Sequence, residues 1–259
     1  MDQDPPEHRE NRQKLSSTTF RPTSTFQAAK LERECKKNWD LFYKRNKTNF
    51  FRDRNWTTRE FTDLMLLDKT KTLLEVGCGV GNFIFPLMET CEAQYFYACD
   101  FSPEAVKLLK MNPLYNENVI KAFTCDITTD EIQNTIQDNS IDIVTVIFVL
   151  SAIHPDKFRK VMENLWRVLK PNGVVLFRDY GVNDMTQWRF RDVSRISENF
   201  YARQDGTRTY FFSDDETKRM FEEVGFRTRE NGYVHRQTVN FKENVDVKRT
   251  FVQGIYEKS

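Results

Sequence analysis

Residues 72–83 of the chain read Thr-Leu-Leu-Glu-Val-Gly-Cys-Gly-Val-Gly-Asn-Phe, and this stretch decides the fold. Its first part, residues 72–76, is a short and mostly apolar run, which is typical of a buried strand. Three glycines, Gly77, Gly79 and Gly81, follow that run at once. Glycines in this place let the backbone turn sharply and let a ligand approach main-chain N–H groups. The stretch therefore predicts a strand followed by a ligand-binding loop.

The spacing of the glycines separates two kinds of ligand. A dinucleotide-binding loop has the pattern GxGxxG, and its third glycine would fall at position 82, where Asn82 stands. The pattern GxGxG, with Glu75 two residues ahead of the first glycine, instead fits a loop that holds S-adenosylmethionine. The alternative for these glycines is a tight turn without a ligand. Two acids at strand ends, described below, argue against that alternative.

Strand and helix signals alternate through the middle of the chain. Strand-like apolar runs occupy residues 72–77, 95–100, 121–126, 142–150 and 173–180, and helical patterns occupy residues 83–90, 103–111, 130–137, 156–169 and 214–226. Alternation of this kind predicts a parallel sheet covered by helices on both faces. Two further strand-like runs, 227–240 and 247–257, end the chain. We therefore predict an α/β fold of the class I methyltransferase type, a doubly wound Rossmann-like sheet with a C-terminal antiparallel hairpin.

The sequence also predicts a division into segments. Residues 1–24 are polar and read as a flexible tail. Residues 25–68 contain a helical period and many aromatic and basic residues, and we expect this segment to cover the cofactor and contact substrate. The methyltransferase domain is expected over residues 69–259, with an inserted hairpin at 199–212. Asp205-Gly206 predicts a type I′ turn for that hairpin, which together with the N-terminal segment would form a substrate-binding subdomain.

Composition excludes several classes of protein. The 259 residues are 30% charged with a net charge of +1, and no apolar run is long enough to span a bilayer, so we expect no membrane partner. Five scattered cysteines without a CxxC pair indicate reduced thiols of a cytoplasmic protein rather than a disulfide framework. Three histidines at unsuitable spacings predict no metal site. Residues 27–60 hold ten Lys and Arg against five Asp and Glu, which suits a polyanionic partner, although a solvated helix face explains such a run equally well.

Acids at strand ends identify candidate cofactor ligands. Asp100 ends the second predicted strand, where a carboxylate can accept hydrogen bonds from both ribose hydroxyls of the cofactor. Asp126 ends the third predicted strand and can accept a hydrogen bond from the adenine amino group. The alternative role for Asp126 is an ordinary helix cap. Ile147 and Phe148 in the fourth strand would pack against the adenine or the methionine arm of the cofactor, or Ile147 would simply belong to the core. Arg178 and Asp179 end the fifth strand. A carboxylate there can accept a hydrogen bond from the amino group of a base and stabilise positive charge on that base. The alternative is a local ion pair between Arg178 and Asp179 without a catalytic role.

Two segments mix aromatic and basic residues. Residues 38–61 contain seven aromatic residues with Lys and Arg among them, and residues 199–212 repeat this mixture. Aromatic faces beside cations suit unpaired RNA bases, whereas the alternative is the apolar seal of a small subdomain. The candidate RNA-binding residues are Phe50, Arg54, Phe200, Tyr201, Arg203 and Arg208. After the fourth strand the chain lacks the Asp/Asn-Pro-Pro-aromatic motif of enzymes that methylate exocyclic amines, which favours a ring nitrogen as the methyl acceptor.

Seven sequence blocks together resemble one family. They are NWDLFYKRN, NFFRDRNWTTREF, LEVGCGVGN, CDFSP, IFVLSAIHPDK, LFRDYG and FYARQDGTRTYFF. From about residue 27 to its end the chain is similar to the tRNA N3-methylcytidine methyltransferases, and the IHPDK and RQDGTR blocks are most similar to the branch that acts on serine tRNAs. The resemblance implies methyl transfer from S-adenosylmethionine to N3 of cytidine 32 in the anticodon loop, with seryl-tRNA synthetase as a partner.

Carried over by position, the resemblance assigns roles to individual residues. The cofactor would contact Trp39, Tyr43, Gly77, Asp100, Asp126 and Ile147, and Gly79 belongs to the same loop. Phe50, Arg54, Arg178 and Asp179 match family positions near the target base. Two other readings stay open: a class I methyltransferase of a protein or small molecule, and an inactive methyltransferase-like scaffold that binds RNA. We expect a cytoplasmic protein, with the nucleus as a second compartment.

Overall fold

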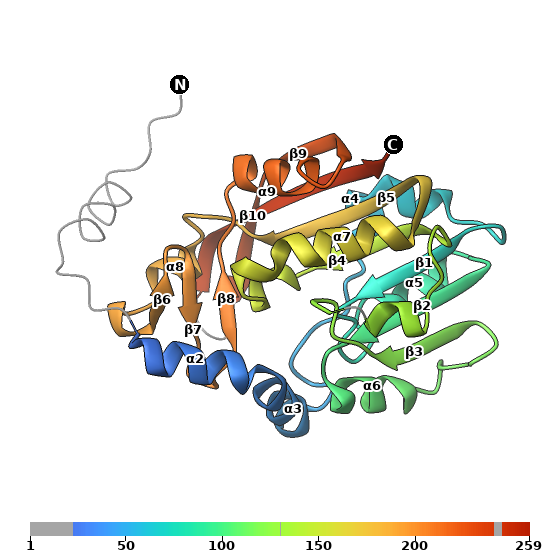
Figure 1. Cartoon of the computed structure of the whole chain (residues 1–259). Helices are drawn as coiled ribbons and strands as arrows, with labels where there is room; N and C mark the ends of the chain where they lie inside the picture. Colours follow the sequence, from blue (N-terminus) through green and yellow to red (C-terminus); the bar gives the residue numbers. More distant parts are fainter. Residues whose placement is uncertain (1–22, 130, 241–244) are drawn as a thin grey trace.

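The computed structural model describes residues 23–129, 131–240 and 245–259, and its centre is a seven-stranded mixed sheet (Figure 1). The strand order is β3-β2-β1-β4-β5-β10-β9. The parallel strands are β1 (Thr72–Val76), β2 (Tyr95–Asp100), β3 (Ile120–Thr124), β4 (Ile141–Ile147) and β5 (Leu169–Tyr180). β10 (Val245–Lys258) pairs antiparallel with β5 and with β9 (Phe226–Asn240). The predicted doubly wound sheet with a C-terminal antiparallel hairpin is confirmed.

Alternating side chains of the strands build two apolar cores, one on each face of the sheet. Leu74 and Val76 of β1 belong to the core that contains α7 (Phe158–Val168) and α9 (Asp214–Glu222). Leu73 belongs to the other core, with α5 (Ile84–Thr90) and α6 (Pro103–Lys110). Because every residue of β1 is buried, this strand lies between the two layers of helices.

Two local predictions differ from the structure. The helix expected at 130–137 is only a short 3-10 turn, η2 (Glu131–Asn134), in the part that is described. The hairpin predicted at 199–212 is present as the antiparallel pair β7 (Phe200–Ala202) and β8 (Arg208–Tyr210), but an unexpected third strand, β6 (Arg195–Ser197), extends it to a three-stranded sheet. The remaining short elements are η3 (Leu150–Ala152), η4 (Pro155–Lys157), α8 (Met185–Trp188) and η5 (Asp192–Ser194).

The predicted type I′ turn of the inserted segment is wrong. Five residues connect β7 to β8, and of the pair Asp205-Gly206 only Gly206 has a positive φ, of 80°. Gly206 N donates to the carbonyl oxygen of Arg203 at 3.0 Å, and the Asp205 carboxylate accepts from Thr207 N at 3.0 Å. This side-chain acceptor closes a longer loop, so a two-residue turn with two left-handed residues is not needed.

The N-terminal segment runs along one side of the molecule, from the small sheet to α6 (Figure 1). The single helical period of the sequence forms two helices, α2 (Thr25–Arg33) and α3 (Cys35–Asn46), which break at Glu34. α4 (Thr57–Glu60) and η1 (Thr62–Leu66) then lead into β1. The predicted tail lies outside the described residues except for Thr23 and Ser24. Among the helices that the structure describes, none has the length and apolar character to cross a membrane.

Candidate active site

A cavity of about 390 Å³ opens at the edge of the sheet where the parallel strands end. Its walls come from the glycine loop after β1, from the residues that follow β2, β3 and β4, and from α3 and β10. The strand order reverses between β1 and β4, and ligands of doubly wound sheets bind at that point. The volume lies in the range of about 300–1,000 Å³ that is usual for small-molecule sites.

The glycine loop forms the floor of this cavity with a backbone that other residues would not adopt. Gly77 and Gly79 have φ values of +67° and +53°. A Cβ atom at Gly77 would lie 2.4 Å from Cγ2 of Val149, and one at Gly79 would lie 2.9 Å from the Tyr43 hydroxyl oxygen. The neighbouring side chains thus approach the loop so closely that only glycine fits. Both glycines line the cavity, as the sequence predicts.

Two carboxylates from the strand ends also line the cavity. Asp100 is buried; its Oδ2 accepts from Gly79 N and its Oδ1 accepts from Ser102 N, both at 2.9 Å. Burial raises the pKa of Asp100 to about 6. Asp126 is half-buried, and its Oδ1 accepts from the backbone N–H of Thr128 at 2.9 Å. Asp126 therefore closes a local turn, and it also faces the cavity.

The residues present fit S-adenosylmethionine. Trp39 and Tyr43 of α3 and the two strand-end carboxylates surround one end of the cavity, where they would hold the aromatic and hydroxyl groups of the cofactor. Glu75 also lines the cavity, and its buried Oε2 has no hydrogen-bond partner among the described residues. A buried carboxylate oxygen without a partner can accept a hydrogen bond from a donor group of the ligand. The described residues contain no group of three or more His, Cys, Asp or Glu side chains that could hold a metal ion.

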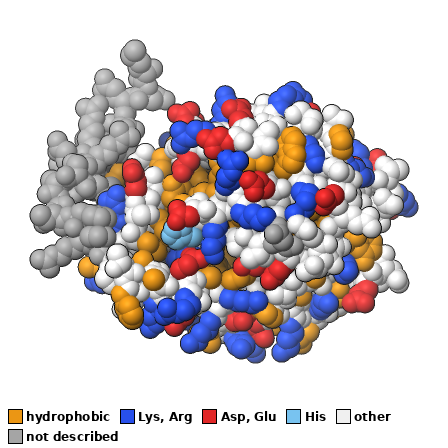
Figure 2. All heavy atoms as spheres, viewed as in Figure 1, with side chains coloured by type: hydrophobic (Ala, Val, Ile, Leu, Met, Phe, Trp, Pro, Cys, Tyr) orange, Lys and Arg blue, Asp and Glu red, His pale blue; other side chains and the backbone are white. Residues whose placement is uncertain are grey.

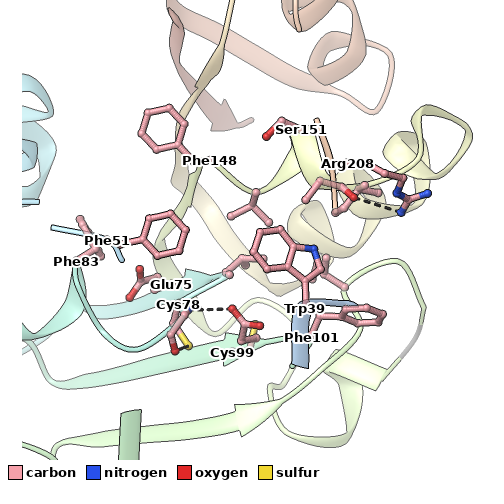
Figure 3. A pocket seen from close by; sticks show the side chains of 18 of the residues that line it. Trp39, Phe51, Glu75, Cys78, Phe83, Cys99, Phe101, Phe148, Ser151 and Arg208 are labelled. Carbon is pink, nitrogen blue, oxygen red and sulfur yellow. Dashed lines mark hydrogen bonds between the residues drawn. The ribbon is translucent and has the colours of Figure 1, made fainter. Parts of the chain in front are cut away.

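Aromatic rings and arginines line the other end of the cavity. Phe148, Tyr180 and Phe251 lie together, with the ring of Phe148 5.1 Å from that of Tyr180 and 5.5 Å from that of Phe251. The guanidinium of Arg54 lies 5.4 Å from the Phe148 ring, and Arg249 lies 5.3 Å from the Phe251 ring. Figure 3 shows Phe51 and Phe148 across the cavity from Trp39 and Phe101. An aromatic and cationic end of this kind suits a planar base.

Sequence reasoning missed several of these residues. Tyr180, Arg249 and Phe251 lie in the cavity wall, but they belong to predicted strands in which the sequence analysis gave these three residues no role. Phe148, by contrast, was expected near the cofactor and does line the cavity; its positive φ of 58° is unusual for an aromatic residue and bends the chain at the end of β4. No sequence motif marks that bend.

The structure does not bring Arg178 and Asp179 to the cavity wall. Asp179 is fully buried behind it, where its carboxylate accepts from Ser151 N and Tyr180 N at 2.9 Å, and burial raises its pKa to about 6. Arg178 points to the other face of β5, where it pairs with Glu60 at 2.8 Å and lies 4.4 Å from the Trp56 ring. Their catalytic roles stay predictions; in this structure Asp179 contacts Ser151 and Tyr180, and Arg178 contacts Trp56, all of which line the cavity.

The other predicted site residues divide into those that line the cavity and those that do not. Arg54, Arg203 and Arg208 line the cavity. Ile147 is a core residue whose carbonyl oxygen accepts from Arg54 Nη1 at 2.9 Å. Phe200 and Tyr201 are buried in the inserted sheet, where Tyr201 stacks on Phe190, and Phe50 is exposed and packs on Phe42 and Phe51. These last three rings do not line the cavity, so their roles in binding RNA stay predictions.

Comparison with known proteins identifies the family to which this chain belongs. Residues 74–175 match the family model described as "Methyltransferase domain". Over 239 residues the chain is 52% identical to human tRNA N(3)-cytidine methyltransferase METTL6, a match that covers 91% of this chain and 84% of the human protein. The chain belongs to the tRNA N(3)-cytidine methyltransferase family. It is therefore a methyltransferase that uses S-adenosylmethionine.

Two further relatives and one solved structure are also similar to this chain. The fission yeast tRNA N(3)-methylcytidine methyltransferase trm141 is 43% identical over 240 residues, which cover 97% of that protein. A Dictyostelium discoideum protein named O-methyltransferase 3 is 48% identical over 193 residues, but these cover only 44% of its length. A solved S-adenosylmethionine-dependent methyltransferase from Anabaena variabilis aligns with a TM-score of 0.63 at 14% identity, over 86% of this chain and 94% of that chain. That structure supports the fold alone.

Proposed function

We propose that this protein transfers the methyl group of S-adenosylmethionine to N3 of cytidine 32 in the anticodon loop of serine tRNAs. The observation that carries the proposal is the cavity with two unlike ends. One end holds the glycine loop with Asp100 and Asp126, and the other holds Phe148, Tyr180 and Phe251 with arginines. The names of the full-length relatives support tRNA cytidine N3 as the acceptor.

The chemistry of cytidine N3 suits this set of residues. Neutral cytosine carries a free lone pair on N3, so attack on the sulfonium methyl needs orientation of the base rather than a strong base catalyst. N3 lies on the pairing edge, so the cytidine must be unstacked before it can enter the cavity. The aromatic end can stack the extruded ring, and Asp179, buried behind the wall, holds Ser151 and Tyr180 in place because its carboxylate accepts from their N–H groups.

The outer surface beside the cavity supports a nucleic-acid substrate. Lys and Arg side chains gather along the edge of the molecule formed by α2, α3 and α6 (Figure 2). Residues on α2 and α3 that contribute to this edge are Lys30, Arg33, Lys36, Lys37, Lys44 and Arg45. A basic edge next to an aromatic cavity can hold the phosphate backbone while one base is presented to the site.

The proposal is tested by methylating purified tRNAs and digesting them for nucleoside mass spectrometry. We expect N3-methylcytidine in serine tRNA that carries cytidine 32, and none in the same tRNA with uridine at position 32. Reactions with and without seryl-tRNA synthetase show whether this partner raises the yield, as we expect from the resemblance of the RQDGTR block. A protein extract and a small-molecule pool serve as competing acceptors. Methyl transfer to these acceptors but to no tRNA, with the synthetase present, would contradict the proposal.

A further inference from the structure

The helix that carries Trp39 and Tyr43 to the cavity has little apolar anchorage of its own. Only Phe42 and Tyr43 of α3 are buried, and no residue of α2 is buried. The apolar cluster beneath α3 is small and is separate from the two main cores of the sheet. Since apolar burial supplies most of the free energy that holds a surface helix, α3 needs other contacts to keep a fixed position.

Asp40 makes such a contact on the cofactor side. It lies between Trp39 and Tyr43 in the sequence, but its side chain is outside the cavity lining. Its Oδ1 accepts a hydrogen bond from Ser102 Oγ at 2.5 Å and a longer one from Glu104 N at 3.4 Å. Ser102 is fully buried and caps the N-terminus of α6 through Ala105 N. A charged acceptor on a buried hydroxyl is among the stronger hydrogen bonds of a protein.

These bonds continue to the groups that face the cofactor. Ser102 N donates to Oδ1 of Asp100, and Gly79 N donates to Oδ2 of the same carboxylate. The hydroxyl of Tyr43 lies close above Gly79. The contacts therefore form a closed ring that leaves α3 at Asp40, passes through Ser102, Asp100 and Gly79, and returns to α3 at Tyr43. A change at any member of the ring displaces the aromatic wall relative to the strand-end carboxylate.

We propose that Asp40 is a positioning residue for the methyl donor, because its bond to Ser102 holds Trp39 and Tyr43 of α3 against the cofactor end of the cavity. It acts through α3 and touches no reacting atom. The inference concerns the donor alone, so its test needs no tRNA and is independent of the proposed acceptor.

The test is the affinity of the whole chain for S-adenosylhomocysteine, measured by calorimetry. We expect Asp40→Ala to weaken binding about tenfold, which corresponds to the loss of one strong hydrogen bond. Alanine favours helix, so α3 itself should still form in this variant. Asp40→Asn keeps an oxygen that can accept from Ser102, and it should restore affinity to within about threefold of wild type. Leu41→Ala is the matched control, because Leu41 neighbours Asp40 and its side chain is 52% exposed.

Hydrogen exchange gives a second measurement. The amides of residues 39–43 should exchange faster in Asp40→Ala than in wild type, and bound S-adenosylhomocysteine should slow them less. Leu41→Ala should resemble wild type in both respects. Wild-type affinity in Asp40→Ala would overturn the proposal. Equal weakening in the Ala and Asn variants would also overturn it, because hydrogen-bond acceptance would then not be the reason.

Discussion

Asp100 is an ordinary strand-end carboxylate whose surroundings change its chemistry. It is 8% exposed, and this burial is the main reason why its pKa rises to about 6. Hydrogen bonds from Ser102 N and Gly79 N lower the pKa, whereas the negative charge of Asp40 nearby raises it. The carboxyl group is therefore about half ionised at pH 6. Its ability to accept hydroxyl donors must change over the interval from pH 5 to pH 7.

The affinity for S-adenosylhomocysteine should follow this ionisation. Ribose hydroxyls donate to the ionised carboxylate better than to the protonated acid, so binding should strengthen as the pH rises through 6. With a pKa of about 6, the ionised fraction grows about tenfold between pH 5 and pH 7, and we expect an affinity gain of up to that size. Calorimetry at pH 5, 6 and 7 measures it. Asp100→Asn should bind weakly and show no such slope; an equal slope in this variant would assign the titration to another group.

Three charged groups attach α4 to the sheet on the far side of the cavity wall. One carboxylate oxygen of Glu60 pairs with Arg178 Nη1 at 2.8 Å, and the other pairs with Arg236 Nη2 at 2.7 Å. These bonds join α4 to β5 and β9, and the Trp56 ring packs on the Arg178 guanidinium. Because Trp56 lines the cavity, the position of α4 decides the shape of that wall.

Glu60→Gln should destabilise the protein. Arg178 is only 3% exposed, so its charge would remain buried with no carboxylate to neutralise it. We expect the free energy of unfolding to fall by about 3 kcal/mol, which is the usual cost of breaking a buried ion pair on one side. Chemical denaturation measures this loss. Arg227→Gln is the control, because the Arg227 side chain is 63% exposed and Glu257, its partner at 2.7 Å, also lies near Arg229, so the loss should be less than about 1 kcal/mol. Equal losses in both variants would show that burial of Arg178 does not matter.

At the scale of the whole molecule, the elements are held in place in two ways, by apolar cores and by polar contacts. The sheet and its helices are held by two apolar cores, and β1 is buried at every residue. The segment of α2 and α3 is held mostly by polar contacts at both of its ends. Glu32 pairs with Arg208 of β8 and with Lys157 at 2.6 Å, and Asn38 Nδ2 donates to the carbonyl oxygen of Gly206 at 2.9 Å. This segment thus bridges the inserted sheet and the cofactor side.

The difference in attachment predicts a difference in local stability. Amides of α2 and α3 should exchange with solvent through local opening, whereas those of β1 and β4 should exchange only on global unfolding. A native-state exchange series in low denaturant measures both free energies. Saturating S-adenosylhomocysteine should protect α3 more than β1, because Trp39 and Tyr43 of α3 line the cavity that we expect it to occupy. Exchange of α3 at the same free energy as β1 would show that the segment opens only together with the core.

Sequence patterns were enough to predict the order of the strands, most of the helices, the glycine loop and the two strand-end carboxylates that line the cavity. These features depend on local signals: alternation along a strand, the absence of a Cβ in a tight turn, and the position of an acid directly after a strand. All parallel strands end at one edge of the sheet, so Asp100 and Asp126 had to meet there.

Only the tertiary structure decided which residues of the later strands and of the N-terminal segment face the cavity. Arg178 and Asp179 are neighbours in the sequence, but the pleat of β5 sends them to opposite faces, and neither reaches the cavity. Arg249 and Phe251 reach it because β10 pairs with the end of β5, a contact between residues about 70 positions apart. Such long-range pairing depends on how the layers of the fold pack together, and a local sequence pattern does not predict it.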